Sequence, residues 1–356
     1  MTDHSPPARA LTRVTDLERS GLTEPQGRAD LERVAQEFRI RVTPEMRGAI
    51  STPADPVAAQ FVPSAHELHI RPEELGDPIG DDAHSPVPGL THRYPDRVIL
   101  HITKTCDVYC RFCFRRETVG EIGPLPEAQL DAALEYIAAT PAIREVILTG
   151  GDPLTLSPRR LGAVLDRLGA IAHLDQIRLH TRVPVVAPER ITEALCERLR
   201  AAPTVWIVLH TNVAQELTEA ARGAIARLVD HGIPLLSQTV LLRGVNADPD
   251  TLEALMRALT ALRVKPYYLH HCDLARGTSH FRTTLAEGRA VMAELARRCS
   301  GTMIPRYVLD IPGGFGKVEI TADHVAPTGT AGQWRITDRQ GRVHDYADPS
   351  RIFDPE

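Results

Sequence analysis

Lysine is almost absent from this chain of 356 residues. Of its 41 basic residues only three are lysine, Lys104, Lys265 and Lys317, so the other 38 are arginine. Either residue serves as a solvated surface charge, but only lysine offers a primary amine whose pKa can be lowered to make it a nucleophile. Each retained lysine is therefore a candidate for amine chemistry.

The chain also lacks the segments by which proteins enter or cross membranes. It has no run of about 18 uncharged apolar residues, and its first residues have neither the basic nor the apolar region of a signal peptide. The formal net charge of −5 is spread without long runs, so nothing indicates nucleic acid or a membrane as a partner. We expect a soluble, cytoplasmic protein that acts on a small molecule.

A second cysteine pair is missing as well. Three of the six cysteines, Cys106, Cys110 and Cys113, stand in one short run, and the others are scattered singly. A structural zinc ion needs four closed ligands, commonly from two such pairs. Three thiolates can instead hold three irons of a [4Fe–4S] cluster and leave the fourth iron open to a second molecule. The missing fourth ligand favours the cluster over zinc or free thiols.

From Arg97 onward, short β-branched runs alternate with segments of helical periodicity. The expected strands are 98–102, 145–148, 176–180, 205–209, 234–240 and 265–269. The expected helices are about 126–139, 158–171, 189–201, 215–231, 250–262 and 285–299. Six β-α units joined by short connections predict an α/β fold with a parallel (β/α)6 partial TIM-type barrel, followed by a further strand near 306–309.

Three regions are expected on this basis. Residues 1–90 are rich in Pro, Asp and Glu and predict an irregular extension with one helix near 29–38, packed against the barrel. Residues 91–303 form the predicted barrel core. Residues 304–356 form a C-terminal segment in which 329–346 has the pattern of a short hairpin.

The unusual residues follow the expected strands. The cysteine run comes after the first strand, Gly150-Gly-Asp-Pro153 after the second, His180-Thr-Arg182 after the third, His210-Thr-Asn212 after the fourth and Cys272-Asp273 after the sixth. In barrels of this kind, catalytic groups gather where strands end and loops begin. We expect these residues to surround one mouth.

Lys317 ends a glycine-rich run, Asp310-Ile-Pro-Gly-Gly-Phe-Gly-Lys317. A phosphate-binding P-loop is excluded, because the glycine and lysine spacing differs from G-x4-G-K-[ST] and Val318 stands where a hydroxyl is required. A lysine flanked by glycines suits instead a Schiff base with pyridoxal phosphate, which needs a primary amine. Lys265, next to a proline within a strand, is interpreted as structural.

These motifs together resemble the lysine 2,3-aminomutase family of radical S-adenosylmethionine (SAM) enzymes that depend on pyridoxal phosphate. The resemblance covers about residues 75–317 and is carried by blocks that occur in the same order. They are 85–97, the cysteine run, Thr149-Gly-Gly-Asp152, 181–186, 238–246, 264–268, Cys272-Asp-Leu274, His280-Phe-Arg282 and Pro312-Gly-Gly-Phe-Gly-Lys317.

The resemblance implies a role for each matching residue. Lys317 would bind pyridoxal phosphate covalently, and Cys106, Cys110 and Cys113 would hold the [4Fe–4S] cluster. Positions implied for the cofactor phosphate are Arg93, Tyr94 and Arg97, and those implied for SAM are Gly150, Gly151, Asp152, His210 and Gln238. A basic loop before the first strand is the alternative for Arg93, and a satisfied core residue is the alternative for His210.

Substrate choice would depend on three further residues. Arg115 matches the arginine that holds the substrate carboxylate, and Asp273 and Asp310 match two acids that receive the side-chain amine of lysine. Helix capping is the alternative for either aspartate. Two acids would attract an ammonium and repel the carboxylate of glutamate. The sequence departs from the family at Glu117, His270 and Phe315 and in lacking C-terminal zinc-binding cysteines.

The expected activity is thus interconversion of L-lysine and β-lysine, with an external electron donor to reduce the cluster. The resemblance leaves open whether β-lysine serves the modification of translation elongation factor P or other metabolism, and it is compatible with a homo-oligomer. A mutase for another cationic amino acid such as arginine is one alternative, and a non-catalytic iron–sulfur protein is another.

Overall fold

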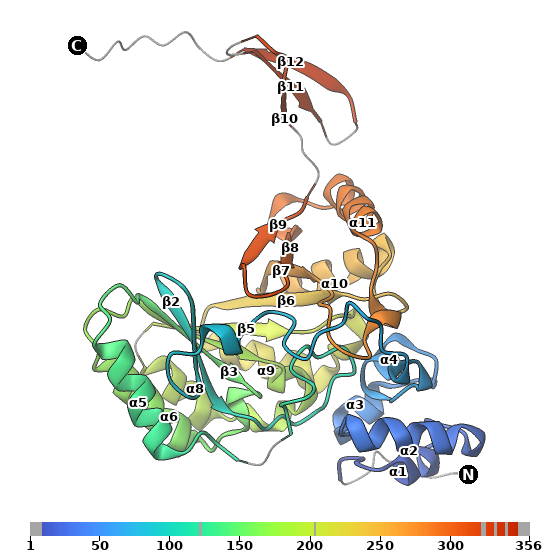
Figure 1. The fold of residues 1–356 in the computed structure, drawn as a ribbon, viewed down its shortest axis with the longest axis vertical. Coiled ribbons are helices and arrows are strands. Elements are labelled where there is room, and N and C mark those ends of the chain that lie inside the picture. Colours follow the sequence, from blue (N-terminus) through green and yellow to red (C-terminus); the bar gives the residue numbers. More distant parts are fainter. Residues whose placement is uncertain are drawn as a thin grey trace.

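A curled sheet of nine strands forms the centre of the protein in the computed structural model, which describes residues 9–120, 123–202, 204–321, 325–330, 333–338 and 341–347 (Figure 1). The strands lie in sequence order, parallel from β2 to β8, with β1 and β9 antiparallel at the edges. They are β1 (Leu90–Tyr94), β2 (Arg97–Thr103), β3 (Glu145–Gly150), β4 (Gln176–Thr181), β5 (Val205–His210), β6 (Leu235–Leu241), β7 (Lys265–His271), β8 (Arg306–Asp310) and β9 (Lys317–Glu319).

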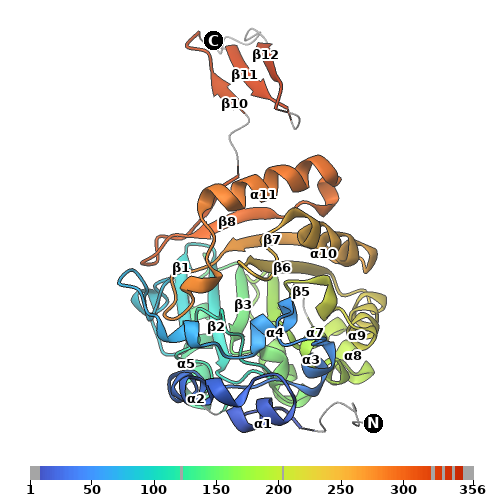
Figure 2. The same ribbon diagram turned by 90° about the vertical axis from the view of Figure 1, so that its right-hand side faces the viewer.

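Helices connect the parallel strands and lie around the outside of the curled sheet (Figure 2). They are α5 (Glu127–Ala138), α6 (Pro158–Gly169), α7 (Val183–Val186), α8 (Glu193–Arg200), α9 (Glu219–Asp230), α10 (Pro249–Ala261) and α11 (Leu285–Arg298). In α6, Ser157 caps the first turn and buried Leu161, Leu165 and Leu168 recur on one face. The predicted (β/α)6 partial barrel is confirmed, and β8 is the further strand expected near 306–309.

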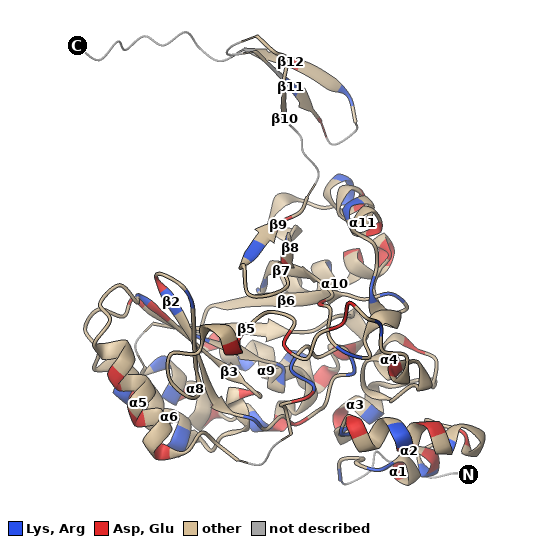
Figure 3. Ribbon diagram, viewed as in Figure 1, with Lys and Arg blue, Asp and Glu red and all other residues tan. Residues whose placement is uncertain are grey.

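The outer helix surfaces carry charges of both signs, as Figure 3 shows for α5 and α6. Arg167 on α6 forms ion pairs with Glu127 and Asp131 on α5. Among the described residues, no helix combines the length and the apolar character that a membrane span requires.

The extension contains four short helices, α1 (Val14–Arg19), α2 (Arg28–Glu37), α3 (Pro44–Ala49) and α4 (Pro56–Phe61). Only α2 was expected, because helices of six residues are too short to show a period. Thr43 and Asp55 cap α3 and α4 ahead of a proline at the first helical position. Apolar side chains of the extension, including buried Met46 and Phe61, join the same core as the barrel strands.

Short 3-10 turns occupy several loops: η1 (Pro25–Gly27), η2 (Ala65–Leu68), η3 (Asp82–His84), η4 (Pro153–Thr155), η5 (Pro188–Arg190), η6 (Ala214–Glu216), η7 (Ser279–Phe281) and η8 (Gly301–Met303). A separate antiparallel sheet contains β10 (Val325–Pro327), β11 (Gln333–Thr337) and β12 (Val343–Ala347). Strands β11 and β12 pair as the hairpin expected in 329–346, and β10 adds a third strand. The division at 90 and 303 stays a prediction; the nine-stranded sheet itself continues through β8 and β9.

Candidate active site

The inner face of the curled sheet lines a cavity of about 530 Å³. Successive side chains of a strand point to opposite faces, so every second residue reaches the cavity. On two neighbouring strands these are Glu145, Ile147 and Thr149 of β3 and Gln176, Arg178 and His180 of β4. A cavity of this size can hold a cofactor together with a small substrate.

The cavity brings together many of the residues that the sequence singled out. Lining it are Arg93, Tyr94, Arg97, Arg115, Gln238, Asp273, Asp310 and Lys317. A second group is not part of this lining and lies around the cysteine loop: Cys106, Cys110, Cys113, Gly150, Gly151, Asp152 and His210. The predicted site thus has two parts, the cavity and the cysteine loop.

Lys317 is placed in the cavity by a tight glycine turn between β8 and β9. The backbone N–H of Ile311 donates to the carbonyl of Gly316 at 2.8 Å, and Gly316 has a φ of 90°, where a side chain would be strained. The turn pairs Lys317 with Asp310 across the two strands, and Lys317 Nζ lies 3.4 Å from Asp310 Oδ2. Burial lowers the pKa of Lys317, which favours the neutral, nucleophilic amine.

The other two lysines do not line this cavity. Lys265 is exposed at the start of β7, and its Nζ donates to the carbonyl of Thr302 at 2.7 Å. The structural interpretation of Lys265 therefore agrees with its contacts.

An acidic pair lies beside Lys317. Burial raises the pKa of Asp273 to about 7, and the negative charge of Asp310 adds to this increase. Burial alone would also raise the pKa of Asp310, but the hydrogen bond from His270 and the charge of Lys317 lower it to about 2. His270 Nδ1 lies 3.3 Å from Asp310 Oδ2. At neutral pH Asp310 is therefore ionised and Asp273 is about half protonated, so Asp273 can lose its proton when a cation binds beside it.

Helix capping does not account for either aspartate. Asp310 belongs to strand β8, and the cap of η7, the first helical turn after Asp273, is Thr278. The family departure at His270 also has a structural role here, because this side chain holds the carboxylate of Asp310.

Two arginines of the cavity share one acid that the sequence did not single out, Asp81. Arg93 Nη2 lies 2.9 Å from Asp81 Oδ1, and Arg115 Nη2 lies 2.7 Å from Asp81 Oδ2. Burial alone would raise the pKa of Asp81, but the charges of Arg115 and Arg93 outweigh it and lower the pKa. Nearby, Arg97 stacks on the ring of Tyr94 at 3.8 Å, and the hydroxyl of Tyr94 accepts the backbone N–H of Lys317 at 2.8 Å.

Two further polar residues of β4 reach the cavity: Arg178, which was not predicted, and His180, which was expected at the mouth of the barrel. Arg178 pairs with Glu145 across β4 and β3, and His180 Nε2 is a buried atom with no hydrogen-bond partner among the described residues. Burial lowers the pKa of His180 well below its usual value, so it is neutral. The inward position of Arg178 on its strand was the signal that could have identified it, since a core strand rarely carries such a group.

The cysteine loop follows β2 and lines a smaller cavity of about 50 Å³, to which all three cysteines contribute. Burial and repulsion from Cys110 raise the pKa of Cys113 to about 11, so the thiols are neutral until a metal ionises them. The described residues contain no group of three or more His, Cys, Asp or Glu arranged around a single ion. Such a group is not required for a cubane cluster, because each cysteine binds a different iron.

The extension holds this loop in place. Glu67 of η2 is fully buried between Arg111 and Arg116, which stand on either side of Cys113 in the sequence. Its carboxylate bonds to both guanidinium groups, and Arg111 Nη1 also donates to the carbonyl of Arg39 at 2.8 Å. The cysteine loop is therefore clamped between the barrel and the extension.

The glycine pair after β3 packs directly on the same loop. A Cβ on Gly151 would lie 2.2 Å from the carbonyl oxygen of Thr105, so only glycine fits. The carboxylate of Asp152 is buried and accepts hydrogen bonds from Thr181 Oγ1 at 2.7 Å and from the backbone N–H of Arg182 at 2.6 Å. His210 packs edge-on against Phe112 at 5.7 Å, and its Nε2 has no partner among the described residues.

Comparison with known proteins identifies the family. Residues 100–259 match the model of the Radical SAM superfamily. An L-lysine 2,3-aminomutase of Fusobacterium nucleatum is 40% identical over 318 residues, covering 88% of this chain and 75% of that protein. One of Acetoanaerobium sticklandii is 41% identical over 315 residues, covering 88% and 76%. The chain belongs to the lysine 2,3-aminomutase family.

Membership of the lysine 2,3-aminomutase family confirms the resemblance drawn from the motifs and makes the protein an isomerase. The family also has a glutamate branch: a glutamate 2,3-aminomutase of Clostridioides difficile is 35% identical over 303 residues, covering 84% of this chain and 72% of that protein. The cofactors of the lysine 2,3-aminomutase family are a [4Fe–4S] cluster, SAM and pyridoxal phosphate.

The residues present fit these three groups. The thiols of the cysteine loop share one small cavity, which suits a cluster. Lys317 provides a mostly buried amine of lowered pKa for pyridoxal phosphate. Buried polar atoms that lack a partner among the described residues, His210 Nε2, His180 Nε2 and Arg93 Nε, leave hydrogen-bonding capacity for bound ligands.

Proposed function

We propose that the protein interconverts L-lysine and β-lysine by moving the amino group between carbons 2 and 3. The observation that carries this proposal is the placement of charge around Lys317. Arg115 and the acidic pair Asp273 and Asp310 line the same cavity, so a zwitterionic amino acid with a cationic side chain finds a partner for each charge. The curated relatives named above support the same substrate.

In this proposal each residue has a separate task. Lys317 holds pyridoxal phosphate, whose phosphate is bound by Arg93, Tyr94 and Arg97, because guanidinium groups bind phosphate with paired hydrogen bonds. The cysteines hold the cluster. SAM is bound by Gly150, Gly151, Asp152, His210 and Gln238. When bound, the cluster and SAM supply a radical that removes a hydrogen atom from the substrate, and pyridoxal phosphate supplies the conjugated system through which the nitrogen migrates.

The carboxylate of Asp152 contributes to SAM binding through the backbone. Its oxygens are occupied by Thr181 and the N–H groups of Arg182 and Leu154. The side chain therefore fixes the loops after β3 and β4 against each other, and the backbone of the glycine pair is the part that can face SAM.

The acidic pair gives the proposal its substrate preference. An ammonium beside two carboxylates in a partly dry site is favoured over a carboxylate by several kcal/mol, on the order of a thousandfold in binding. Glutamate would place a third acid there. The acidic pair thus disfavours glutamate but admits arginine as a second candidate substrate, because the guanidinium is also a cation.

A substrate panel tests the proposal. The reconstituted protein is incubated anaerobically with SAM, pyridoxal phosphate, a reductant and separately lysine, arginine or glutamate, followed by amino acid analysis. We expect β-lysine from lysine and no product from glutamate. Turnover of arginine without turnover of lysine would replace the substrate assignment, and a fully reconstituted protein that converts none of them would support a binding role.

Arg115→Lys tests the carboxylate-binding role. A lysine keeps the positive charge but cannot form the paired contact of a guanidinium. We expect KM for lysine to rise by roughly 10- to 100-fold, because about 1.5–3 kcal/mol of charge-assisted hydrogen bonding is lost. The control is Arg178→Lys, which alters another arginine of the cavity. An unchanged KM in the Arg115 variant, measured by steady-state kinetics, would assign carboxylate binding elsewhere.

We propose that an external one-electron donor reduces the cluster and that the protein works in the cytoplasm, where a reducing environment preserves iron–sulfur chemistry.

A further inference from the structure

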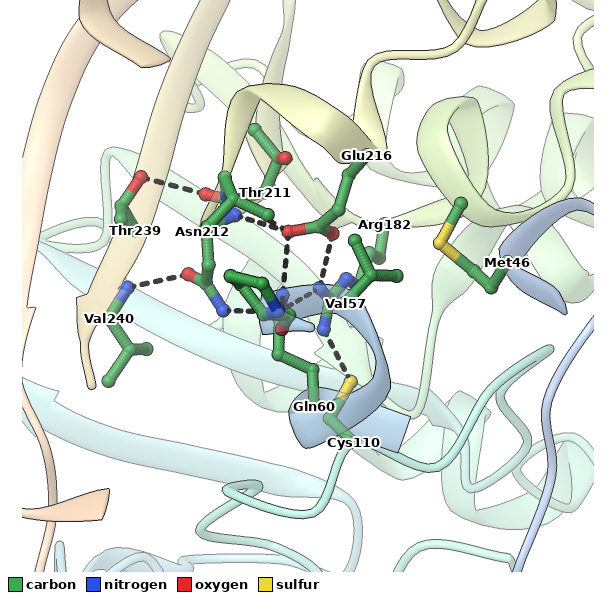
Figure 4. A network of polar contacts seen from close by, with 12 residues as sticks. Met46, Val57, Gln60, Cys110, Arg182, Thr211, Asn212, Glu216, Thr239 and Val240 are labelled. Carbon is green, nitrogen blue, oxygen red and sulfur yellow. Dashed lines mark hydrogen bonds and ion pairs between the residues drawn. The ribbon is translucent and has the colours of Figure 1, made fainter. Parts of the chain in front are cut away.

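A buried network of polar side chains surrounds Cys110 (Figure 4). At its centre is Arg182, in the loop after β4, whose Nη1 donates a hydrogen bond to Cys110 Sγ at 2.8 Å. The side chain of Arg182 is 5% exposed, and it is paired with Glu216, whose side chain is fully buried. A positive charge is thus held inside the protein in contact with one of the three cluster-binding sulfurs.

Neighbouring groups fix the guanidinium in this position. Nη2 donates to Glu216 and, at 2.6 Å, to Oε1 of Gln60. Gln60 in turn donates from Nε2 to Glu216 Oε1 at 3.0 Å and accepts from Asn212 Nδ2 at 2.9 Å. Glu216 also accepts the backbone N–H groups of Asn212 and Val213 at 2.8 and 3.0 Å. These groups come from three separate parts of the fold: α4 of the extension, the loop after β4, and η6 with the loop before it.

A contribution to the stability of the fold does not by itself explain why this ion pair is buried. Burying an ion pair costs desolvation free energy that an apolar pair of the same volume would avoid. The N–H directed at sulfur has a specific effect, because the potential of an iron–sulfur cluster depends on hydrogen bonds to its sulfurs and on nearby charge. Adding an electron makes the cluster sulfurs more negative. A donor and a positive charge at Cys110 therefore stabilise the reduced state more than the oxidised state.

We propose that Arg182 is a positioning residue that raises the reduction potential of the cluster through its hydrogen bond to Cys110. Glu216 opposes this effect, because its negative charge lies beside the same guanidinium. Gln60 of the extension bonds to both side chains and holds them in place. The redox step itself is the uptake of one electron from the external donor, with no bond formed or broken. The inference rests on the cluster being bound at the three cysteines, as in the proposed function, and not on which amino acid is the substrate.

The test is a redox titration of the reconstituted protein without SAM or substrate, in which electron paramagnetic resonance measures the reduced cluster. For Arg182→Gln we expect the ratio of reduced to oxidised cluster at a fixed potential to fall at least tenfold, a shift of about 59 mV for one electron. For Glu216→Gln we expect a shift in the opposite direction. Arg182→Lys retains the charge and should lie between Arg182→Gln and the wild type.

Arg227→Gln is the matched control, because Arg227 also pairs with a glutamate but lies on the outer helix α9. Iron and sulfide analysis shows which variants carry a full cluster. Should Arg182→Gln fail to hold one, Arg182→Lys and Glu216→Gln still give the direction of the shift. The proposal is overturned if the cluster in fully loaded variants has the same reduction potential as in the wild type. It is also overturned if Arg182→Gln and Glu216→Gln shift this potential in the same direction. Absence of lysine turnover in the fully loaded wild type, with these shifts intact, would overturn the proposed function alone.

Discussion

Replacing Lys317 by alanine is expected to abolish both the covalent attachment of pyridoxal phosphate and turnover, with kcat falling by at least about a thousandfold. The reason is chemical as well as geometric. Only a primary amine forms the linkage, and Lys317 is the one lysine that lines the cavity among the described residues. Its side chain is mostly buried, and burial lowers the pKa of the amine, which favours the neutral form that attacks a carbonyl.

The measurement is the visible absorbance of the lysine-bound cofactor, followed by borohydride reduction and mass spectrometry to locate the modified residue. Lys265→Ala is the matched control, because its amine is exposed and donates to the carbonyls of Thr302 and Ile304. We expect this variant to keep the cofactor and its activity. An unchanged absorbance band in Lys317→Ala would move the attachment to Lys104 or Lys265.

The alternation of apolar runs and helical periods was sufficient to predict the barrel. Helix α6 was expected at 158–171 and spans Pro158–Gly169, and β5, expected at 205–209, spans Val205–His210. These elements are amphipathic or largely buried, so their pattern is local and strong. The six-residue helices α3 and α4 depend on a cap and on packing with the barrel, which leaves too few positions for a period to be seen.

Site residues marked by a local sequence pattern could likewise be predicted, whereas those defined by contacts between distant positions could not. Lys317 was found from its rarity and its glycine turn, both of which are visible in a few residues. Asp81 was missed because its role depends on two arginines that are 12 and 34 positions away along the chain. The contact between Arg182 and Cys110 spans 72 positions, and Gln60 joins it from a different region of the protein. Only the folded chain brings such partners together.

The acidic pair makes the affinity for lysine depend on pH. The pKa of Asp273, about 7, is raised from its ordinary value, so below pH 7 its carboxyl is mostly protonated and cannot serve as a counter-ion. The side-chain ammonium of free lysine stays charged to about pH 10. Binding of the cation must therefore release the proton of Asp273 at low pH. We expect kcat/KM for lysine to rise nearly tenfold per pH unit below pH 7 and to level off above it.

Asparagine substitutions of the two acids separate their contributions, as measured by the pH profile of kcat/KM. Asp273→Asn should lower kcat/KM at pH 8 by roughly 30- to 1,000-fold, because removing one partner of a buried charge pair costs about 2–4 kcal/mol, and it should flatten the rise. Asp310, with a pKa of about 2, is ionised throughout this range. Asp310→Asn should therefore lower kcat/KM at every pH but keep the rise. Its midpoint should move to lower pH, because the negative charge that raises the pKa of Asp273 is gone. A wild-type profile that is flat from pH 6 to 8, or a rise that survives in Asp273→Asn, would remove Asp273 from the ammonium site.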